Sequence, residues 1–403
     1  LIALHQLLLS LHASTALMHW NTMTRRGRIP RLHHMGIATT VCALLHAYDA
    51  ATSAGATRKH QSQLQLKKAV SRHLAHSASV PSSTRSAPKQ SFAAFVLDFD
   101  GTLTKEDTIS KITSTRRKLL PTNNDCLEYD DNLKTVIKEY LRDREAISKA
   151  SYSSIETLLE ACAEAEFRSL ERVERYGLLG GLSRDDLRFT GSTSVKLQEG
   201  VEDFLVKTSQ RGIPIHICSA NWSKDLIIGA LQHLTDGKAV KLANVASSDL
   251  EFDERGSMLS TGKIRRNIVT ADDKKKYLED IRKTTKSEGR IVYIGDGQPD
   301  VLAMLNADVG IIVGDGSSLR KTAEMARGVQ LLTASAQCEF DGLFDALSSR
   351  DGNHRYVLDA QKYGESVYSQ ISGETSVDVA ASEKRTWSLI SDMCFGSPGR
   401  ADT

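Results

Sequence analysis

The sequence predicts an α/β protein: a doubly wound parallel sheet with a Rossmann-like core and a helical cap inserted after the first strand motif. Three short apolar runs, at 95–97, 213–218 and 291–294, each lead into polar residues at a turn. Apolar runs of this length before a turn are typical of buried parallel strands. Helix-like stretches separate them, and the chain of 403 residues is long enough for a core domain, an insert and tails.

The first run ends in two aspartates, Asp98 and Asp100, which are followed by Gly101 and Thr102. Residues two apart on a strand point the same way, so both carboxylates leave the strand end together. Two such groups are costly to place side by side unless a cation lies between them. A hard cation with oxygen ligands, and a substrate phosphate as a further ligand, would satisfy them. A simple Asp-x-Asp-Gly turn or a piece of a calcium loop is the alternative at this point.

The third run leads into Gly295 and then into Asp296, Gly297 and Asp300. Asp296 is expected at the carboxyl end of a strand, which is where open α/β sheets bind ligands. Asp300, one turn further on, is placed to orient a metal ligand from behind. The glycine spacing does not complete a dinucleotide fingerprint, because position 300 is Asp and not Gly. A solvated turn is the alternative for this stretch alone.

The middle run ends at Ser219 and Ala220, just before a helix-like stretch from Trp222 to Leu234. A hydroxyl and backbone N–H groups at the start of a helix form a natural phosphate site. Serine is also an ordinary helix N-cap, so this motif alone has a purely structural alternative.

Lys274 lies near the start of an amphipathic stretch just before the third apolar run. Its ammonium group would neutralise part of a crowded acidic site. We choose it over its two lysine neighbours because apolar Tyr277 and Leu278 follow at three and four residues, facing the core. A run of three lysines is otherwise typical of a solvated helix face.

Taken in order, these motifs resemble the signature of the haloacid dehalogenase-like hydrolases over residues 91–349. The resemblance implies a Mg²⁺-dependent phosphatase with Asp98 as the nucleophile and Asp100 as the general acid/base. It implies phosphate-binding residues and metal-binding residues as well. The phosphate set is Gly101, Thr102, Ser219, Ala220 and Lys274, and the metal set is Asp98, Asp100 (through its carbonyl) and Asp296, with Asp300 behind them.

A long insert separates the first two motifs, and we expect it to form a helical cap. Residues 153–176 are a strong helix candidate that stops at Gly177, and another helical stretch covers 131–149. Caps of this kind exclude water and select the substrate. The expected domains are a disordered 1–90, a core of 91–104 and 199–349, a cap of 105–198 and a mostly disordered tail of 350–403.

Stretches beyond the catalytic motifs resemble the phosphatase part of the plant bifunctional thiamine-salvage proteins and, more distantly, phosphoserine phosphatases. They are 172–181, 197–200, 219–222 with 225–227, 243–244, 260–262, 307–311 and 317–320. The resemblance implies thiamine monophosphate as the favoured substrate, with phosphoserine as the alternative. It also implies that Asp107, at the base of the cap, binds a cationic part of the substrate. A helix-capping role favoured by the helix dipole is the alternative for Asp107.

Residues 1–90 differ in composition from the rest of the chain. They hold eleven Lys or Arg and a single acid, Asp49, which gives +10, so the remainder carries −8 within the overall +2. An acid-poor segment rich in Ser, Ala and Arg is typical of an organelle transit peptide, and we expect entry to mitochondria or plastids. A secretory signal and a cytoplasmic location are alternatives. A basic nucleic-acid-binding arm is disfavoured because Lys is sparse.

The remaining features narrow the function. The six cysteines contain no C-x-x-C pair, which argues for a reduced compartment and against a zinc site. Asp100 argues against a dehalogenase, and Phe99 argues against the transport ATPases, which carry Lys there. We expect a Mg²⁺-dependent phosphomonoesterase for a small phosphorylated metabolite, with no nucleic-acid partner, no membrane span and an unknown oligomeric state. A phosphomutase of the same fold and a non-catalytic scaffold are the rival functions.

Overall fold

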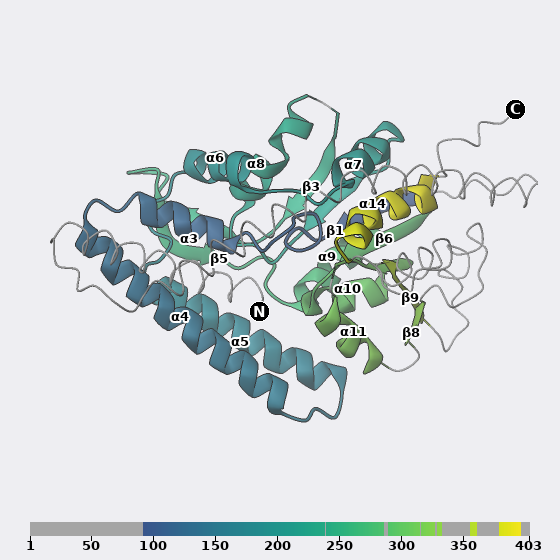
Figure 1. The fold of residues 1–403 in the computed structure, drawn as a ribbon, viewed down its shortest axis with the longest axis horizontal. Helices are drawn as coiled ribbons and strands as arrows, with labels where there is room; N and C mark the ends of the chain where they lie inside the picture. The colour runs from purple at the N-terminus through teal and green to yellow at the C-terminus, as the bar shows by residue number, and fades with distance from the viewer. Residues whose placement is uncertain are drawn as a thin grey trace, which may run out of the picture. The chain divides into compact units, whose positions relative to one another are not determined.

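The structure is a computed structural model in which residues 92–237, 239–285, 289–314, 316–326, 329–332, 355–360 and 379–395 are described (Figure 1). The chain divides into two compact units, and all the described residues lie in the unit made of 1–7, 89–366 and 377–403. The transit-like segment predicted at 1–90 lies outside the described residues.

In the part of the chain that the structure describes, seven parallel strands form the central sheet. They are β1 (Phe92–Leu97), β2 (Ile215–Cys218), β3 (Leu242–Ala246), β6 (Arg290–Gly295), β7 (Val309–Ile312), β8 (Val329–Leu332) and β9 (Arg355–Asp359). Their order across the sheet is β3-β2-β1-β6-β7-β9-β8, and every neighbouring pair is parallel. In chain order, β2 and β3 are added on one side of β1, and the next strand of the sheet, β6, lies on the other side of β1. This reversal defines a doubly wound sheet, so the predicted fold class is confirmed.

Helices pack on both faces of β1, which explains why that strand is apolar throughout and buried along its whole length. Phe95 packs against Phe204 with ring centroids 5.2 Å apart. Its neighbour Val96 points to the opposite face and belongs to a core cluster with Leu278. The helices of the core are α7 (Val201–Gln210), α8 (Lys224–Thr235), α9 (Ala271–Thr284), α10 (Val301–Asn306), α11 (Ser317–Glu324) and α14 (Val379–Phe395), with the short turn η1 (Gln298–Asp300). In the described part of the chain, no helix is both long and apolar enough to cross a membrane.

The insert after β1 is helical, and all of residues 105–198 are described. Its helices are α3 (Ile109–Lys118), α4 (Asn123–Lys149), α5 (Ile155–Arg175) and α6 (Arg184–Ser194). The long helices α4 and α5 lie side by side (Figure 1), and Arg172 of α5 binds Asp143 of α4 at 2.7 Å. Each begins with a capping box, at Thr122 and at Ser154, which fixes where the helix starts.

A two-stranded antiparallel hairpin, β4 (Asp249–Phe252) and β5 (Ser260–Arg265), joins the base of the insert to the core. The Gly181 N–H donates to the Ser260 carbonyl at 2.8 Å, and the Ser260 N–H donates to the Leu182 carbonyl at 2.8 Å. Glu174, in the last turn of α5, accepts a hydrogen bond from the Ile264 N–H at 3.0 Å. These hydrogen bonds fix the position of the C-terminal end of α5 relative to β5.

Two segments of the tail at 350–403, which was predicted to be mostly disordered, form regular elements. The strand β9 lies inside the sheet between β7 and β8, and the helix α14 packs against α7. Trp387, Ile390 and Cys394 recur at helical spacing and bury one face of α14. Trp387 is fully buried, with its ring 5.1 Å from Phe204. The apolar part of β9 is too short to stand out in the sequence, and the rest of the tail lies outside the described residues.

Replacement of Trp387 tests whether α14 belongs to the folded core. Trp387→Ala should lower the free energy of unfolding by about 3–5 kcal/mol, because it leaves a large cavity against Phe204. Urea denaturation would measure this, with the exposed Ser388→Ala as the matched control on the same helix. Equal stability of the two variants would show that α14 does not pack here in solution.

Candidate active site

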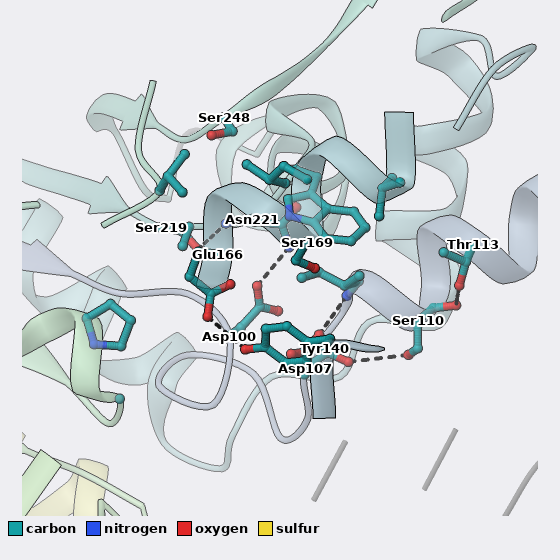
Figure 2. Close-up of a pocket in the computed structure, with 18 of the residues that line it drawn as sticks. Asp100, Asp107, Ser110, Thr113, Tyr140, Glu166, Ser169, Ser219, Asn221 and Ser248 are labelled. Atoms are coloured by element: carbon teal, nitrogen blue, oxygen red, sulfur yellow. Dashed lines mark hydrogen bonds between the residues drawn. The ribbon is translucent and has the colours of Figure 1, made fainter. Parts of the chain in front are cut away.

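The carboxyl ends of β1, β2 and β6 meet at one edge of the sheet, because Leu97 pairs with both Ile217 and Ile294. A cavity of about 290 Å³ opens there, between the core and the insert (Figure 2). Of the predicted site residues, the cavity is lined by Asp98, Asp100, Asp107, Ser219, Ala220, Lys274 and Asp296. Gly101, Thr102 and Asp300 lie outside this lining.

Lys274, near the start of α9, is buried between two carboxylates. Its Nζ lies 2.9 Å from Asp98 Oδ1 and 2.6 Å from Asp300 Oδ1. Burial acts to lower the pKa of Lys274, but the charges of Asp300 and Asp98 outweigh burial and raise it. The group therefore stays charged. The next lysine, Lys275, is turned away and pairs with Glu279 on the helix surface.

Asp98 follows directly after β1 and is only 6% exposed. Burial, and next the charge of Asp300, raise the pKa of its carboxyl to about 7, against the lowering effect of Lys274. Its Oδ1 touches Lys274 Nζ without an aligned hydrogen bond. The carboxylate is thus held in position by charge while its oxygen lone pairs stay available to a ligand.

Asp100 occupies a different environment from Asp98. Its Oδ1 accepts hydrogen bonds from the Thr108 N–H at 2.8 Å and from the Thr108 hydroxyl at 2.6 Å, and its Oδ2 accepts one from Asn221 Nδ2 at 2.8 Å. Burial, and next the charge of Asp107, raise the pKa of Asp100 to about 6, against these hydrogen bonds. Such a carboxyl can give and take a proton close to neutral pH.

Asp296 packs closely against the turn after β1. The Thr102 hydroxyl donates to Asp296 Oδ1 at 2.9 Å. Gly101 has a φ of +73°, and a Cβ there would lie 2.4 Å from Asp296 Oδ2, so only glycine fits this turn. In this structure Thr102 orients the Asp296 carboxylate, and its predicted phosphate contact stays a prediction.

The carboxylates of Asp98, Asp296 and Asp300 each place an oxygen within 4.8 Å of the others. Burial first, and then the charges of Asp98 and Asp300, raise the pKa of Asp296 well above its usual value. The donors are all carboxylate oxygens, which are the ligands that hard divalent cations such as Mg²⁺ prefer. The residues present therefore fit a magnesium ion.

Asp300 is bound more completely than the other two carboxylates. Its Oδ1 accepts hydrogen bonds from Lys274 at 2.6 Å and from the Tyr293 hydroxyl at 2.7 Å, and its Oδ2 accepts one from the Gly297 N–H at 2.9 Å. These contacts suit a residue that holds Lys274 and the loop after β6. Asp98 and Asp296 are the members of the cluster with more freedom to bind a metal.

Asp107 lies at the start of α3 and also lines the cavity. The N-cap of α3 is Thr108, and the Oδ1 of Asp107, one residue earlier, accepts a hydrogen bond from the first helical N–H, that of Ile109, at 2.9 Å. Burial raises the pKa of Asp107, and the charges of Asp98 and Glu166 add to this rise. Both roles considered for Asp107 are therefore compatible with its position.

Several residues of the site were not predicted from the sequence. Thr108 and Asn221 hold Asp100, while Tyr140 and Glu166 line the cavity from the insert (Figure 2). Asn221 follows Ser219 by two residues at the end of β2, which is a signal that could have been used. The other three depend on how the insert folds back over the core, and no spacing along the chain shows that.

Comparison with known proteins identifies relatives. The family described as haloacid dehalogenase-like hydrolase matches residues 95–305. The protein named "Bifunctional TH2 protein, mitochondrial" from Arabidopsis thaliana is 30% identical over 202 residues, which are 48% of this chain and 31% of that protein. The match therefore covers less than a third of that relative's length.

Solved structures with low sequence identity are similar as well. A phospho-aspartyl intermediate analogue of phosphoserine phosphatase has a TM-score of 0.38 at 17% identity, over 59% of this chain and 92% of that one. Cytosolic 5′-nucleotidase IIIB bound to cytidine has a TM-score of 0.38 at 15% identity, over 74% and 85%. Scores this low do not bear on the substrate.

The carboxylate cluster predicts how stability depends on pH and Mg²⁺. The pKa of Asp98 is raised from 3.8 to about 7, so in this range the folded protein holds a proton that the unfolded chain has lost. This contribution is complete below pH 3.8 and is lost as the pH rises through about 7. Mg²⁺ should therefore raise the melting temperature of the wild-type protein more at about pH 8 than at about pH 5.

Thermal unfolding in EDTA and in Mg²⁺ would measure this effect. Asp296→Asn should remove most of the stabilisation by Mg²⁺, whereas Asp131→Asn, on an exposed part of α4, should not. Equal stabilisation of both variants by Mg²⁺ would rule out this cluster as the metal site.

Proposed function

Because the chain belongs to the haloacid dehalogenase-like hydrolases, we propose that it is a phosphatase of that family, a Mg²⁺-dependent phosphomonoesterase acting on a small metabolite. The observation that carries the proposal is the contrast between two neighbouring carboxylates. Asp98 faces the buried ammonium of Lys274, while Asp100 is held apart by Thr108 and Asn221. Two carboxylates in different environments can take two roles in one reaction.

In the proposed reaction, an oxygen of Asp98 attacks phosphorus and an aspartyl-phosphate forms as the bond to the leaving oxygen breaks. Asp100 gives its proton to that leaving oxygen. Asp100 then takes a proton from a water molecule, whose oxygen attacks the aspartyl-phosphate and releases Asp98 and phosphate. Acid/base help of this kind contributes about 10²–10⁴-fold to the rate.

The remaining residues would bind the phosphate and the metal. Ser219 is 1% exposed at the end of β2, and its hydroxyl lines the cavity together with Lys274. We assign phosphate oxygens to these two side chains, to the Ala220 N–H and to the turn at Gly101 and Thr102. Asp98, Asp296 and the Asp100 carbonyl would hold Mg²⁺, which when bound neutralises charge on the phosphate.

Thiamine monophosphate is the substrate that we favour, with phosphoserine as the alternative. The support is the sequence resemblance to plant thiamine-salvage phosphatases outside the catalytic motifs, and the position of Asp107 in the cavity wall. A half-buried carboxylate there can bind the positive charge of a thiazolium ring.

We also propose that the amino-terminal segment directs the protein to mitochondria or plastids. Residues 1–90 are acid-poor, and the Arabidopsis relative is described as mitochondrial. Residues 1–90 fused to a fluorescent protein should carry the reporter into an organelle. A reporter that stays in the cytoplasm would contradict this.

The role of Asp98 is tested by replacing its nucleophilic oxygen. Asp98→Asn should reduce kcat by roughly a thousandfold or more, because Asn keeps the shape of the side chain but is a poor nucleophile. Phosphate release from p-nitrophenyl phosphate would measure it, with circular dichroism to verify folding. The exposed Asp131→Asn serves as control and should keep full activity. Substantial turnover by pure Asp98→Asn protein would refute the assignment.

The role of Asp107 is tested with substrates of different charge. Asp107→Asn should raise KM for thiamine monophosphate far more than for p-nitrophenyl phosphate, by about 1–3 kcal/mol in binding free energy. Asn keeps an oxygen that can accept from the Ile109 N–H, so capping of α3 is preserved. Equal effects on both esters would leave Asp107 with the capping role alone. A higher kcat/KM for phosphoserine than for thiamine monophosphate in the wild type would overturn the favoured substrate.

A further inference from the structure

The part of the cavity under the cap is apolar over much of its surface. Its wall carries Leu133, Val136 and Ile137 from α4, and Leu170 and Val173 from α5. The aromatic rings of Trp222 and Tyr140 line the same space. A leaving group that binds here must bury apolar or aromatic surface, because polar groups would lose their water without gaining partners.

The charged side chains at this end of the cavity are acidic. They are Asp107 at the start of α3 and Glu166 in α5, and the charge of Glu166 helps to raise the pKa of Asp107. Lys274 is the one basic side chain among the described lining residues, and it is bound to Asp98 and Asp300 at the catalytic end. No cationic side chain in this lining is placed to bind an anionic leaving group.

Glu166 is held in one orientation and still faces the cavity (Figure 2). Its Oε1 accepts a hydrogen bond from the Tyr140 hydroxyl at 2.7 Å, and 31% of its side-chain surface is exposed. Its Oε2 accepts no hydrogen bond from the described residues. Arg144 Nη1 is 3.9 Å from Oε1, and the Nη2 atom of Arg144 donates to Gln298 at 3.0 Å. Glu166 therefore keeps one oxygen for a ligand.

We propose that Glu166 is a specificity-determining residue that binds, together with Asp107, a positive charge on the leaving group of the substrate. The inference rests on the proposed phosphatase function and adds a second carboxylate, from the cap, to its substrate site. The preferred substrate is then a phosphate ester whose alcohol part is cationic and otherwise apolar or aromatic. An aromatic ring beside the charge, such as that of Tyr140 or Trp222, adds to cation binding.

The same arrangement disfavours esters that carry a carboxylate. The carboxylate of a phosphorylated amino acid would approach Asp107 or Glu166, and like charges in a partly desolvated site repel strongly. Specificity would thus come from repulsion of the wrong ester as well as from attraction of the right one.

A matched pair of esters tests the proposal. Phosphocholine and 3,3-dimethylbutyl phosphate have the same shape, but the first carries a quaternary ammonium where the second has a neutral carbon. The wild-type enzyme should prefer phosphocholine in kcat/KM. Glu166→Gln should reduce kcat/KM for phosphocholine by about tenfold or more and change that for the neutral ester by less than about threefold.

Two further variants serve as a control and as a second test. Glu164→Gln removes a charge from the solvent-exposed face of α5 and should leave the preference unchanged. Tyr140→Phe keeps the ring but removes the hydroxyl that orients Glu166, and should lower the preference for phosphocholine in the same direction. Tyr140→Phe thus tests the preference for phosphocholine even if Glu166→Gln does not fold.

The outcomes separate this inference from the proposed function. Hydrolysis of the neutral ester without any preference for phosphocholine would refute the role of Glu166 and leave the phosphatase assignment standing. The same holds if Glu166→Gln slows both esters alike, as expected of a residue that only holds Arg144. Failure of the wild type to hydrolyse either ester in Mg²⁺ would refute both the proposed function and the inference that rests on it.

Discussion

The burial of Lys274 between Asp98 and Asp300 is the interaction on which the rest of the site depends. Oxygens of three carboxylates converge within 4.8 Å near the ends of parallel strands. Lys274 supplies a positive charge that partly neutralises them. A buried ammonium is tolerated because two partners meet it, whereas removing one partner of such a network is strongly destabilising. Tyr293 and the Gly297 N–H hold Asp300 in turn, so β6 and the loop after it keep the network in place. The negative charge left over suits a divalent cation, which would in turn offset the negative charge of a phosphate.

The loop after β6 is also hydrogen-bonded to the helical insert. Gln298 accepts hydrogen bonds from Arg144 at 3.0 Å and from the Cys162 thiol at 3.2 Å, and it donates to Thr322 at 3.1 Å. Through Gln298, the loop that carries Asp296 is therefore hydrogen-bonded to α4 and α5, two helices that line the cavity. The position of Asp296 is therefore linked to that of the two long helices of the insert through this side chain.

Much of the fold and of the catalytic end of the site could be predicted from the sequence. Asp98 and Asp296 each follow an apolar run, and the ends of parallel strands must share one edge of the sheet. Lys274 could be selected from three lysines by the spacing of the apolar residues that follow it. Thr108 and Glu166 could not be found, because their contacts to Asp100 and to the cavity exist only after the insert has folded back. The elements β9 and α14 could not be predicted for a similar reason. Their apolar patterns are short, and only the folded core shows which residues they bury.

We propose that Asp98, which lies against Lys274, carries the phosphoryl group during turnover. The most direct test is to mix the Mg²⁺-loaded enzyme with substrate, trap it with borohydride, and analyse the peptides by mass spectrometry. Borohydride reduces an aspartyl-phosphate to homoserine. Homoserine is expected at position 98, formed only when substrate is present. Homoserine at another aspartate, or its absence during active turnover, would contradict the claim.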